Sequence, residues 1–246
     1  MEYTLFIFGL VFGSFYNVCI YRMPKGESIV APPSHCGHCG EQLKPLDLVP
    51  VLSYIFLRGK CRYCKEKVSL RYPLIELLTG AAFAFSYFRF GLTLMTIESM
   101  ILSSIIIIVS FIDIDHHLIL NRFSVVTMVV GIVFVFLNPN MEYLDALYGF
   151  LIGGGVLFII AVVGPMGGGD IKWMAGLGLI LGFWKTVLAM YLGVIIGAVI
   201  SVILIVLKIK KMKSYVAFGP FLGIGAFLAF HYFKEIVELY LKLIGY

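Results

Sequence analysis

The stretch that decides the fold is "TLMTIESMILSSIIIIVS", Thr93 to Ser110, which is followed at once by "FIDIDHH", Phe111 to His117. The eighteen residues from Thr93 to Ser110 carry one charge, Glu98, and an apolar run of this length crosses the hydrocarbon core of a bilayer as a helix. Two carboxylates, Asp113 and Asp115, stand directly at its end. Ionisable groups at membrane depth commonly cost ~3 kcal/mol or more each and usually mark function. The stretch therefore predicts a spanning helix that carries acidic side chains into a site.

The composition extends this prediction to most of the chain. Of 246 residues, 61% are hydrophobic and only 13% are charged, whereas a soluble domain is about half apolar and about a quarter charged. Similar apolar runs recur along the sequence, which indicates an all-α polytopic membrane protein. We expect eight spans, at about residues 2–20, 73–90, 93–112, 123–137, 145–164, 171–183, 185–207 and 217–241.

The charges between these spans predict the orientation of the chain. Residues 22–71 hold nine Lys and Arg against four acids, and "KIKKMK" at 208–213 adds four lysines. The loop "NPNMEYLD" at 138–145 has two acids and no Lys or Arg. The positive-inside rule places the basic segments in the cytoplasm and both termini outside. The turns at 113–122 and 165–172 then also face the cytoplasm.

Three domains follow from this organisation. Residues 1–21 form the first spanning helix, 22–72 a cytoplasmic domain, and 73–246 a seven-helix membrane domain. The cytoplasmic segment is rich in Pro and Gly and too small for much of a hydrophobic core, so it needs a staple.

Two cysteine pairs in this segment could supply such a cross-link by binding a metal ion. "CGHC" and "CRYC" are separated by 21 residues, and each CxxC turn can present two thiolates to one side of a metal ion. We predict a structural zinc site ligated by Cys36, Cys39, Cys61 and Cys64. The alternative is a set of reduced, unliganded thiols or a redox pair; disulfides are disfavoured in the cytosol. Because both ends of the segment join membrane spans, we expect a membrane-surface platform and no nucleic acid.

A second isolated acid, Asp170, follows three glycines in "GPMGGGDIKW", Gly164 to Trp173. Asp113 and Asp170 end one cytoplasm-directed span and begin another, so we expect them at similar depth. Two facing carboxylates in a poorly solvated site do not both ionise easily; one keeps a proton, as in the aspartic proteases. The charged one can activate water and the protonated one can polarise a peptide carbonyl. The simpler alternative is an interfacial acid or, for Asp170, a helix cap.

Spacing alone leaves the partner of Asp170 open. Asp113 and Asp115 are two residues apart, which is about 200° around a helix, so both cannot face one partner. Either acid satisfies this argument equally well.

Together these residues resemble the type IV prepilin peptidases, bifunctional leader peptidases and N-methyltransferases of bacterial membranes. The match covers most of the chain through "GSFYNVCIYRMP" (Gly13 to Pro24), the two CxxC pairs, "RYPLIELLTG" (Arg71 to Gly80), "FIDIDHHLIL" (Phe111 to Leu120) and the GxGD form "GGGDIK" (Gly167 to Lys172). The family commonly has Pro-Asp where this chain has Leu120-Asn121.

The resemblance implies a function and a catalytic pair. Prepilin or pseudopilin precursors would be cleaved after a glycine at the cytoplasmic face of the bacterial cell membrane, by the aspartates Asp113 and Asp170. The new N-terminus would then be methylated with S-adenosylmethionine, for which no binding residues can be assigned.

Four further charged residues have two interpretations each. Glu76, near the start of the second span, is a methyl-transfer or partner residue, or an interfacial acid. Arg22 and Arg71 bracket the cytoplasmic domain and either serve it or anchor helices at the headgroups. Lys172 either tunes the Asp170 site or reaches the interface.

Two other classes of function account for parts of this sequence. Intramembrane acids also serve in transporters, but those place polar groups at several depths, whereas here the acids gather at one face. A membrane-anchored zinc adaptor would leave Asp113 and Asp170 without a role.

Overall fold

The computed structural model describes residues 1–138, 141–164, 166–209, 211 and 216–244. The described residues form helices joined by loops, together with two isolated β-bridges, and the chain divides into two compact units, Met1–Ile108 and Val109–Tyr246. The expected all-α architecture is confirmed for these residues.

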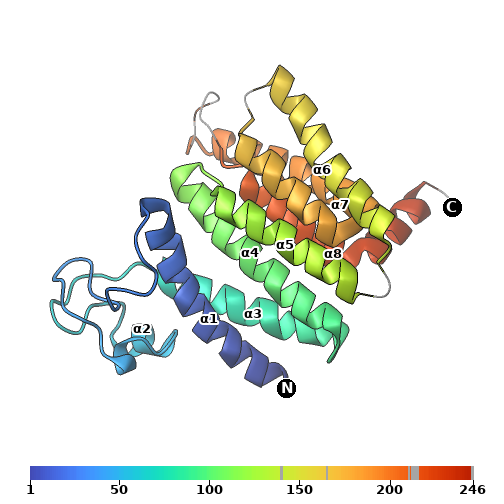
Figure 1. Cartoon of the computed structure of the whole chain (residues 1–246). Coiled ribbons are helices and arrows are strands. Elements are labelled where there is room, and N and C mark those ends of the chain that lie inside the picture. The colour runs from blue at the N-terminus through green and yellow to red at the C-terminus, as the bar shows by residue number, and fades with distance from the viewer. Residues whose placement is uncertain (139–140, 165, 210, 212–215, 245–246) are drawn as a thin grey trace. The chain divides into compact units, whose positions relative to one another are not determined.

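The first unit holds two long antiparallel helices and the loop domain between them (Figure 1). Its elements are α1 (Glu2–Arg22), η1 (Met23–Lys25), η2 (Pro45–Asp47), α2 (Leu52–Phe56), α3 (Arg71–Phe90) and the first part of α4 (Leu94–His116). Figure 1 shows the segment between α1 and α3 extending beyond the adjoining ends of both helices. The predicted polar domain therefore connects the two antiparallel helices α1 and α3, which we call the stems.

Glycines set the close approach of α1 to α3. A Cβ on Gly9 would lie 2.7 Å from Cα of Gly80, and one on Gly13 would lie 2.6 Å from Cα of Glu76. Gly9 and Gly13 are four residues apart and share one face of α1, the small-residue spacing that lets membrane helices pack closely. This contact brings Glu76 up against α1.

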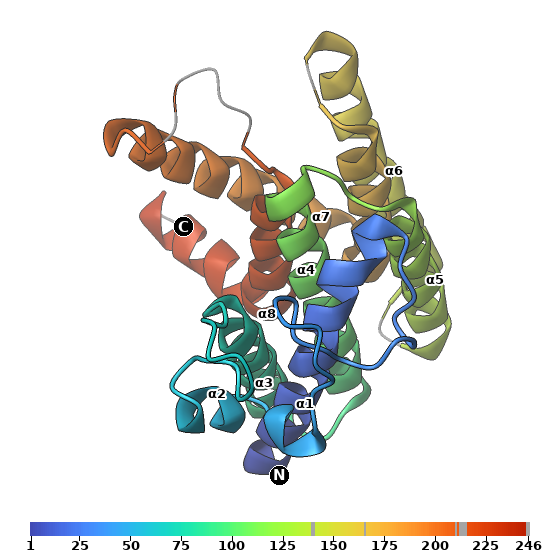
Figure 2. The ribbon, with the colours of Figure 1, turned by 90° about the vertical axis from the view of Figure 1, so that its left-hand side faces the viewer.

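The second unit begins inside α4 and continues with α5 (Asn121–Leu137), α6 (Tyr143–Val163), α7 (Gly168–Val206) and α8 (Gly219–Leu243). Helix α7 packs against α5, α6 and α8 (Figure 2). A Cβ on Gly149 of α6 would lie 2.2 Å from the carbonyl oxygen of Gly178 in α7, so these two backbones touch. Small residues again determine which faces meet.

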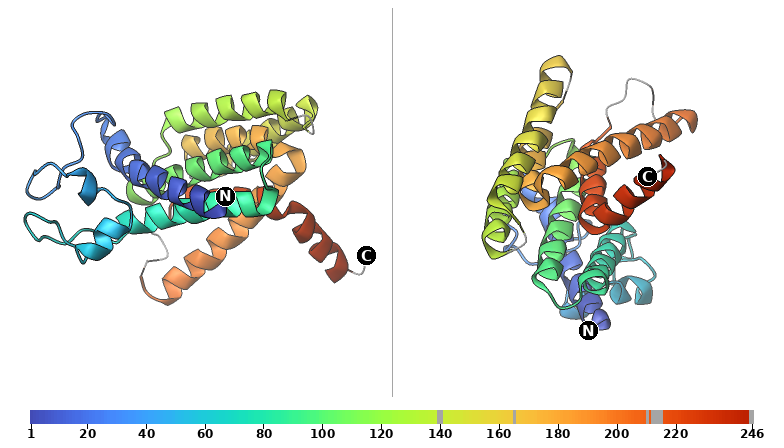
Figure 3. Two further views of the ribbon diagram at one scale, coloured as in Figure 1. Left: turned by 90° about the horizontal axis from the view of Figure 1, so that it is seen from below. Right: turned by 90° about the vertical axis from the view of Figure 1, so that its right-hand side faces the viewer.

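Helix α7 is two helices joined at a kink. Gly182 has φ 73° and ψ 180°, outside the helical region and inside the region that favours glycine. The amide of Phe183, which starts the second half, donates to Oδ1 of Asp145 in α6 at 3.1 Å. Figure 3 shows the two halves of α7 diverging. The separation expected between residues 171–183 and 185–207 therefore has a physical cause.

Four helices among the described residues are long and apolar enough to cross a membrane: Glu2–Lys25, Leu94–His116, Tyr143–Val163 and Phe183–Val206. Helix α5 is apolar but shorter, and α3 carries Arg71, Glu76 and Arg89. The chain is thus a membrane protein, while the number of eight spans stays a prediction. Parts of two loops used for orientation, residues 139–140 and 210 with 212–213, lie outside the described residues.

Candidate active site and metal site

Asp113 is a buried carboxylate near the end of α4. It lies three residues before His116, the last residue of the helix, and its relative exposure is 6%. The backbone amide of Gly219, the first residue of α8, donates to its Oδ2 at 2.9 Å. A helix N-terminus carries a partial positive charge that favours an anion. The start of α8 therefore holds Asp113 in a position that suits its ionised form.

Asp115 lies on a different side of the same helix. Its side chain is exposed, whereas Asp113 is buried, as expected for residues about 200° apart. The spacing in the sequence did not decide between the two acids, but the structure does. Asp113 faces the interior of the second unit and Asp115 does not.

Asp170 is the third residue of α7 and is partly buried. Its Oδ1 is buried and accepts no hydrogen bond from any described residue, and the carboxylate lies close enough to Asp113 for their charges to repel. Ile119 lies beside both the glycine that precedes Asp170 and the glycine that bonds Asp113. A Cβ on Gly169 would lie 2.9 Å from Cβ of Ile119, and a Cβ on Gly219 would lie 3.3 Å from its Cδ1. The structure thus gathers the end of α4 and the starts of α7 and α8 around the two aspartates.

The three glycines before Asp170 differ in their surroundings. A Cβ on Gly169 would meet Ile119, and one on Gly167 would lie 3.1 Å from Oδ2 of Asp170. A Cβ on Gly168 would have no described atom within 4 Å. The two crowded positions, Gly167 and Gly169, are therefore the two glycines of the GxGD pattern, and the open position, Gly168, is its variable residue.

Lys172 contacts the position at which this chain departs from the family pattern. Its Nζ donates to Oδ1 of Asn121 at 3.1 Å, and both side chains are exposed. An amide therefore accepts here the hydrogen bond that an aspartate would accept with a full charge.

The four predicted metal ligands come together in the first unit. The sulfur atoms of Cys36, Cys39, Cys61 and Cys64 all lie within 4.8 Å of one another, and those of Cys36 and Cys64 are 3.9 Å apart. Four thiolates about 2.3 Å from a tetrahedral zinc ion would be about 3.8 Å apart. The donor set and its spacing therefore fit a zinc ion.

The two CxxC turns have the same backbone pattern. In each, the amide of the first cysteine donates to the carbonyl five residues later, and the amide four residues later donates back, with N···O distances of 2.8 to 3.1 Å. Hydrogen bonds from the backbone at Cys39 and then His38 lower the pKa of the Cys36 thiol to about 6. A metal ligand must be a thiolate, and these hydrogen bonds favour that form of Cys36.

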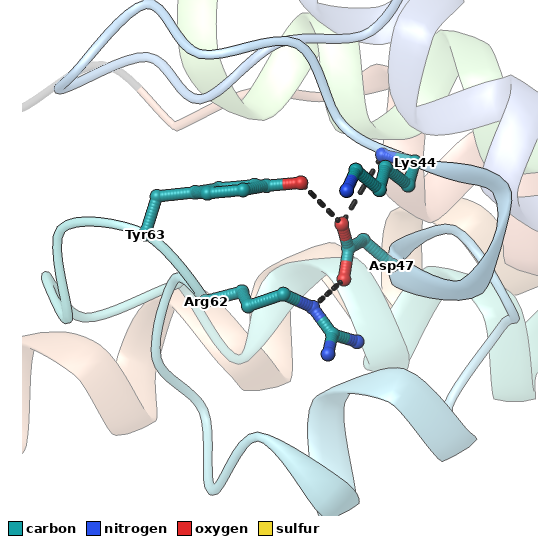
Figure 4. Close-up of polar contacts among 4 residues, drawn as sticks. All are labelled: Lys44, Asp47, Arg62 and Tyr63. Carbon is teal, nitrogen blue, oxygen red and sulfur yellow. Dashed lines mark hydrogen bonds and ion pairs between the residues drawn. The ribbon is translucent and has the colours of Figure 1, made fainter.

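Asp47 joins the second turn to the chain between the two turns (Figure 4). Its Oδ1 accepts from Nε of Arg62, and its Oδ2 accepts from the Tyr63 hydroxyl at 3.3 Å and the Lys44 amide at 3.1 Å. Burial alone would raise the pKa of Asp47, but the Arg62 and Lys44 hydrogen bonds outweigh it and hold that pKa below its ordinary value. Sequence reasoning missed Asp47, since an acid in a polar loop carries no distinctive signal.

Two charged residues of the stems are buried. Glu76 is 7% exposed, and its Oε2 accepts from the Val51 amide at 2.7 Å. Arg22 is also 7% exposed and donates to the carbonyls of Ser28 at 3.0 Å and Pro33 at 3.4 Å. Arg22 therefore holds the loop domain, and its interpretation as a headgroup anchor is wrong. Glu76 is an acid with a partner in the loop domain.

Comparisons with known proteins agree with this arrangement. Residues 7–90 match the Bacterial Peptidase A24 N-terminal domain, and residues 100–202 match the Type IV leader peptidase family. The chain is 35% identical over 245 residues to the prepilin leader peptidase/N-methyltransferase of Bacillus subtilis, with 97% of each chain covered. It is 30% identical over 255 residues to the protein of that name from Neisseria gonorrhoeae, covering 91% of this chain and 88% of the relative.

No solved structure matches the chain. The two matched segments and the near-complete coverage of the relatives show that the chain belongs to the type IV leader peptidase family.

Proposed function

We propose that this protein cleaves the leader from type IV prepilin-like precursors and then methylates the new N-terminus. Two curated relatives that carry this pair of activities in their names align over nearly the whole chain. The observation that carries the proteolytic part is the buried Asp113, which accepts the α8 amide and lies close to Asp170, whose Oδ1 has no hydrogen-bond partner among the described residues.

The two aspartates would divide the work of hydrolysis. Asp113, whose Oδ2 accepts the Gly219 amide, suits the ionised role and would take a proton from the attacking water. A protonated Asp170 would donate from its carboxyl group to the oxygen of the scissile carbonyl. The proton on Asp113 would then pass to the leaving amine as the C–N bond breaks, and the proton that Asp170 gave to the carbonyl oxygen would return to Asp170 as the C=O bond reforms. Each step uses a carboxyl group in the protonation state that like-charge repulsion between the pair favours.

The glycines before Asp170 suit an extended substrate. Gly168 has open space around its Cα, so the backbone of a bound peptide can approach it without meeting a side chain.

The cofactors have separate tasks in this proposal. A zinc ion held by Cys36, Cys39, Cys61 and Cys64 would staple the loop domain, as a closed four-thiolate site does. S-adenosylmethionine would supply the methyl group. An ion held by these four thiolates would have no open position for water or substrate, so it would serve the fold and not peptide hydrolysis.

The proposal places the enzyme in the bacterial inner membrane with eight spans. The basic loop domain and the turn that precedes Asp170 would face the cytoplasm by the positive-inside rule. Precursors anchored in the same bilayer would then reach the aspartates laterally, with their charged leader on the cytoplasmic side.

A reconstitution tests both activities at once. Purified, zinc-loaded protein is incubated with a prepilin, with and without S-adenosylmethionine, and the products are weighed by mass spectrometry. Loss of the leader is expected in both reactions, and the mass of one methyl group is gained only with the donor. Folded protein that leaves every tested precursor intact would refute the proteolytic part.

A further inference from the structure

A cavity of about 710 Å³ lies within the first unit, between the helix stems and the loop domain. Its walls come from the end of α1, the start of α3, helix α2 and both CxxC turns. Sites that enclose a small organic ligand measure about 300–1,000 Å³. The cavity is therefore large enough for a ligand of cofactor size, and the aspartate pair belongs to the other unit.

Buried polar groups line this cavity. Asn17 is 6% exposed and Glu76 is 7% exposed, and both are wall residues. Nδ2 of Asn17 donates to the carbonyls of Gly13 at 3.1 Å and Tyr72 at 3.2 Å. These bonds fix the orientation of the side-chain amide, whose Oδ1 is its acceptor atom.

Glu76 is held in place by the loop domain. Its Oε2 accepts from the Val51 amide, and Ser14 also hydrogen bonds to the carboxylate. Val51 has φ 61°, an unfavourable conformation for a β-branched residue that the surrounding structure must maintain. A carboxylate accepts about four hydrogen bonds, so Glu76 keeps acceptor capacity for a ligand.

The charges and rings of the wall indicate the class of ligand. Four acidic and four basic side chains line the cavity, a balance that suits a zwitterion better than a polyphosphate. Three tyrosines, Tyr21, Tyr54 and Tyr72, supply aromatic faces on which a nucleobase can stack. A buried carboxylate among them favours a ligand that also carries a positive charge.

We propose that this cavity binds S-adenosylmethionine, with Glu76 as the counter-charge of the sulfonium, an inference that rests on the methylation part of the proposed function. The amine of the cleaved pilin attacks the methyl carbon; a C–N bond forms, the C–S bond breaks, and its electron pair leaves with the sulfur as a neutral thioether. The ammonium formed at nitrogen releases one proton to water. Glu76 is a binding residue for the donor in this scheme.

Equilibrium binding to the purified full-length protein tests the assignment. In Glu76→Gln, the amide oxygen can still accept from Val51, but the negative charge is gone. The affinity for S-adenosylmethionine should fall on the order of tenfold or more. The affinity for S-adenosylhomocysteine, which lacks the positive charge, should change less than about threefold. Unchanged binding of the donor, or an equal loss for both ligands, would overturn the role of Glu76.

Glu41→Gln is the matched control, since Glu41 is an exposed acid of the same domain that does not line the cavity. It should bind both ligands as the wild type does. Zinc content and leader cleavage should also be retained in Glu76→Gln, which shows that the variant is folded. If the wild type neither binds S-adenosylmethionine nor methylates a precleaved pilin, the methylation part of the proposed function fails; if it does both and Glu76→Gln is unaffected, only the site assignment fails.

Ultraviolet cross-linking of radiolabelled S-adenosylmethionine to the wild type gives an answer that needs no variant. Label is expected in peptides that contain wall residues, between residues 14 and 76. Label confined to peptides from residues 109–244 would overturn the proposal.

Discussion

The backbone amide of Gly219 donates a 2.9 Å hydrogen bond to Oδ2 of Asp113, which ties the start of α8 to the end of α4. There is no room at this contact for a side chain, because a Cβ on Gly219 would lie 2.8 Å from that same oxygen and 3.3 Å from Cδ1 of Ile119. Gly219 is therefore a positioning residue for the proposed catalytic pair.

Gly219→Ala should lower kcat for leader cleavage on the order of tenfold or more, because displacement of a catalytic group by a fraction of an ångström is costly. KM should stay within about twofold, since the change displaces Asp113 and removes no group that is proposed to bind the peptide. Steady-state cleavage of a prepilin measures both. Gly155→Ala, at an α6 position with no described atom within 4 Å of the new Cβ, is the control. A Gly219→Ala enzyme with normal kcat would contradict this role.

The triplet before Asp170 offers a second matched pair. Gly169→Ala would push a methyl group against Ile119, with only 2.9 Å to its Cβ, whereas Gly168→Ala meets open space. At saturating prepilin, cleavage should fall on the order of tenfold in the first variant and stay within about twofold in the second, whose added methyl group would meet the bound peptide and raise KM instead. Initial rates at saturating prepilin decide the matter, and equal effects at both positions would show that the glycines act through the substrate and not through Ile119.

The sequence revealed those parts of the site whose side chains are unusual for their surroundings. Asp113 and Asp170 were conspicuous because charges are rare beside long apolar runs, and the four cysteines because CxxC turns have a fixed spacing. The sequence predicts a gap between two spans at residue 184, and the break of α7 lies two positions earlier, at Gly182. The choice of Asp113 over Asp115 needed either the family pattern or the fold, since helical periodicity only separates them.

Other parts of the site left no signal in the sequence. Gly219 acts through its backbone amide on a residue 106 positions away, and any residue type has such an amide. The cavity beside Glu76 arises from the close packing of α1 on α3, which the spacing of Gly9 and Gly13 allows, and from the path of the loop domain, which has no local pattern beyond the two CxxC turns. Asp47 is an ordinary acid in a polar loop until Arg62 and Tyr63 fold onto it.

The metal site gives the third prediction. Purified protein should contain about one zinc per chain. Asp47→Asn keeps the size of the side chain but removes the charge that Arg62 meets, so the second CxxC turn should be held less firmly. Zinc transfer to a chelator should become several-fold faster, as expected when the groups that orient metal ligands are changed.

Glu41→Gln again serves as the control and should release zinc at the wild-type rate. A metal-free protein with an intact loop domain would refute the zinc site itself. If Asp47→Asn and the wild type release zinc at the same rate, the Asp47 contacts do not help to hold the metal. The Asp47–Arg62 ion pair would then contribute less than about 1 kcal/mol, as exposed ion pairs usually do.

The fourth prediction separates the two activities. Asp113→Asn should abolish leader cleavage and still methylate a precleaved pilin, because the cavity beside Glu76 lies in the other unit. Glu76→Gln should cleave the leader normally, and it should methylate more slowly than the wild type when the S-adenosylmethionine concentration is below its raised Kd. Parallel assays with intact and precleaved substrates compare them. If either folded variant loses both activities, one shared site is the better explanation.

The central claim is that Asp113 and Asp170 form the proteolytic pair and Asp115 does not. Single-turnover cleavage of a prepilin by the folded variants Asp113→Asn, Asp170→Asn and Asp115→Asn tests it most directly. The first two should be slower by a factor on the order of 10² or more, the low end for losing general acid–base help. Their combination should be little worse than either alone, since groups that act as one unit do not add. Asp115→Asn, altered at an exposed side chain, should keep substantial activity. Full activity in Asp113→Asn together with an inactive Asp115→Asn would contradict the account.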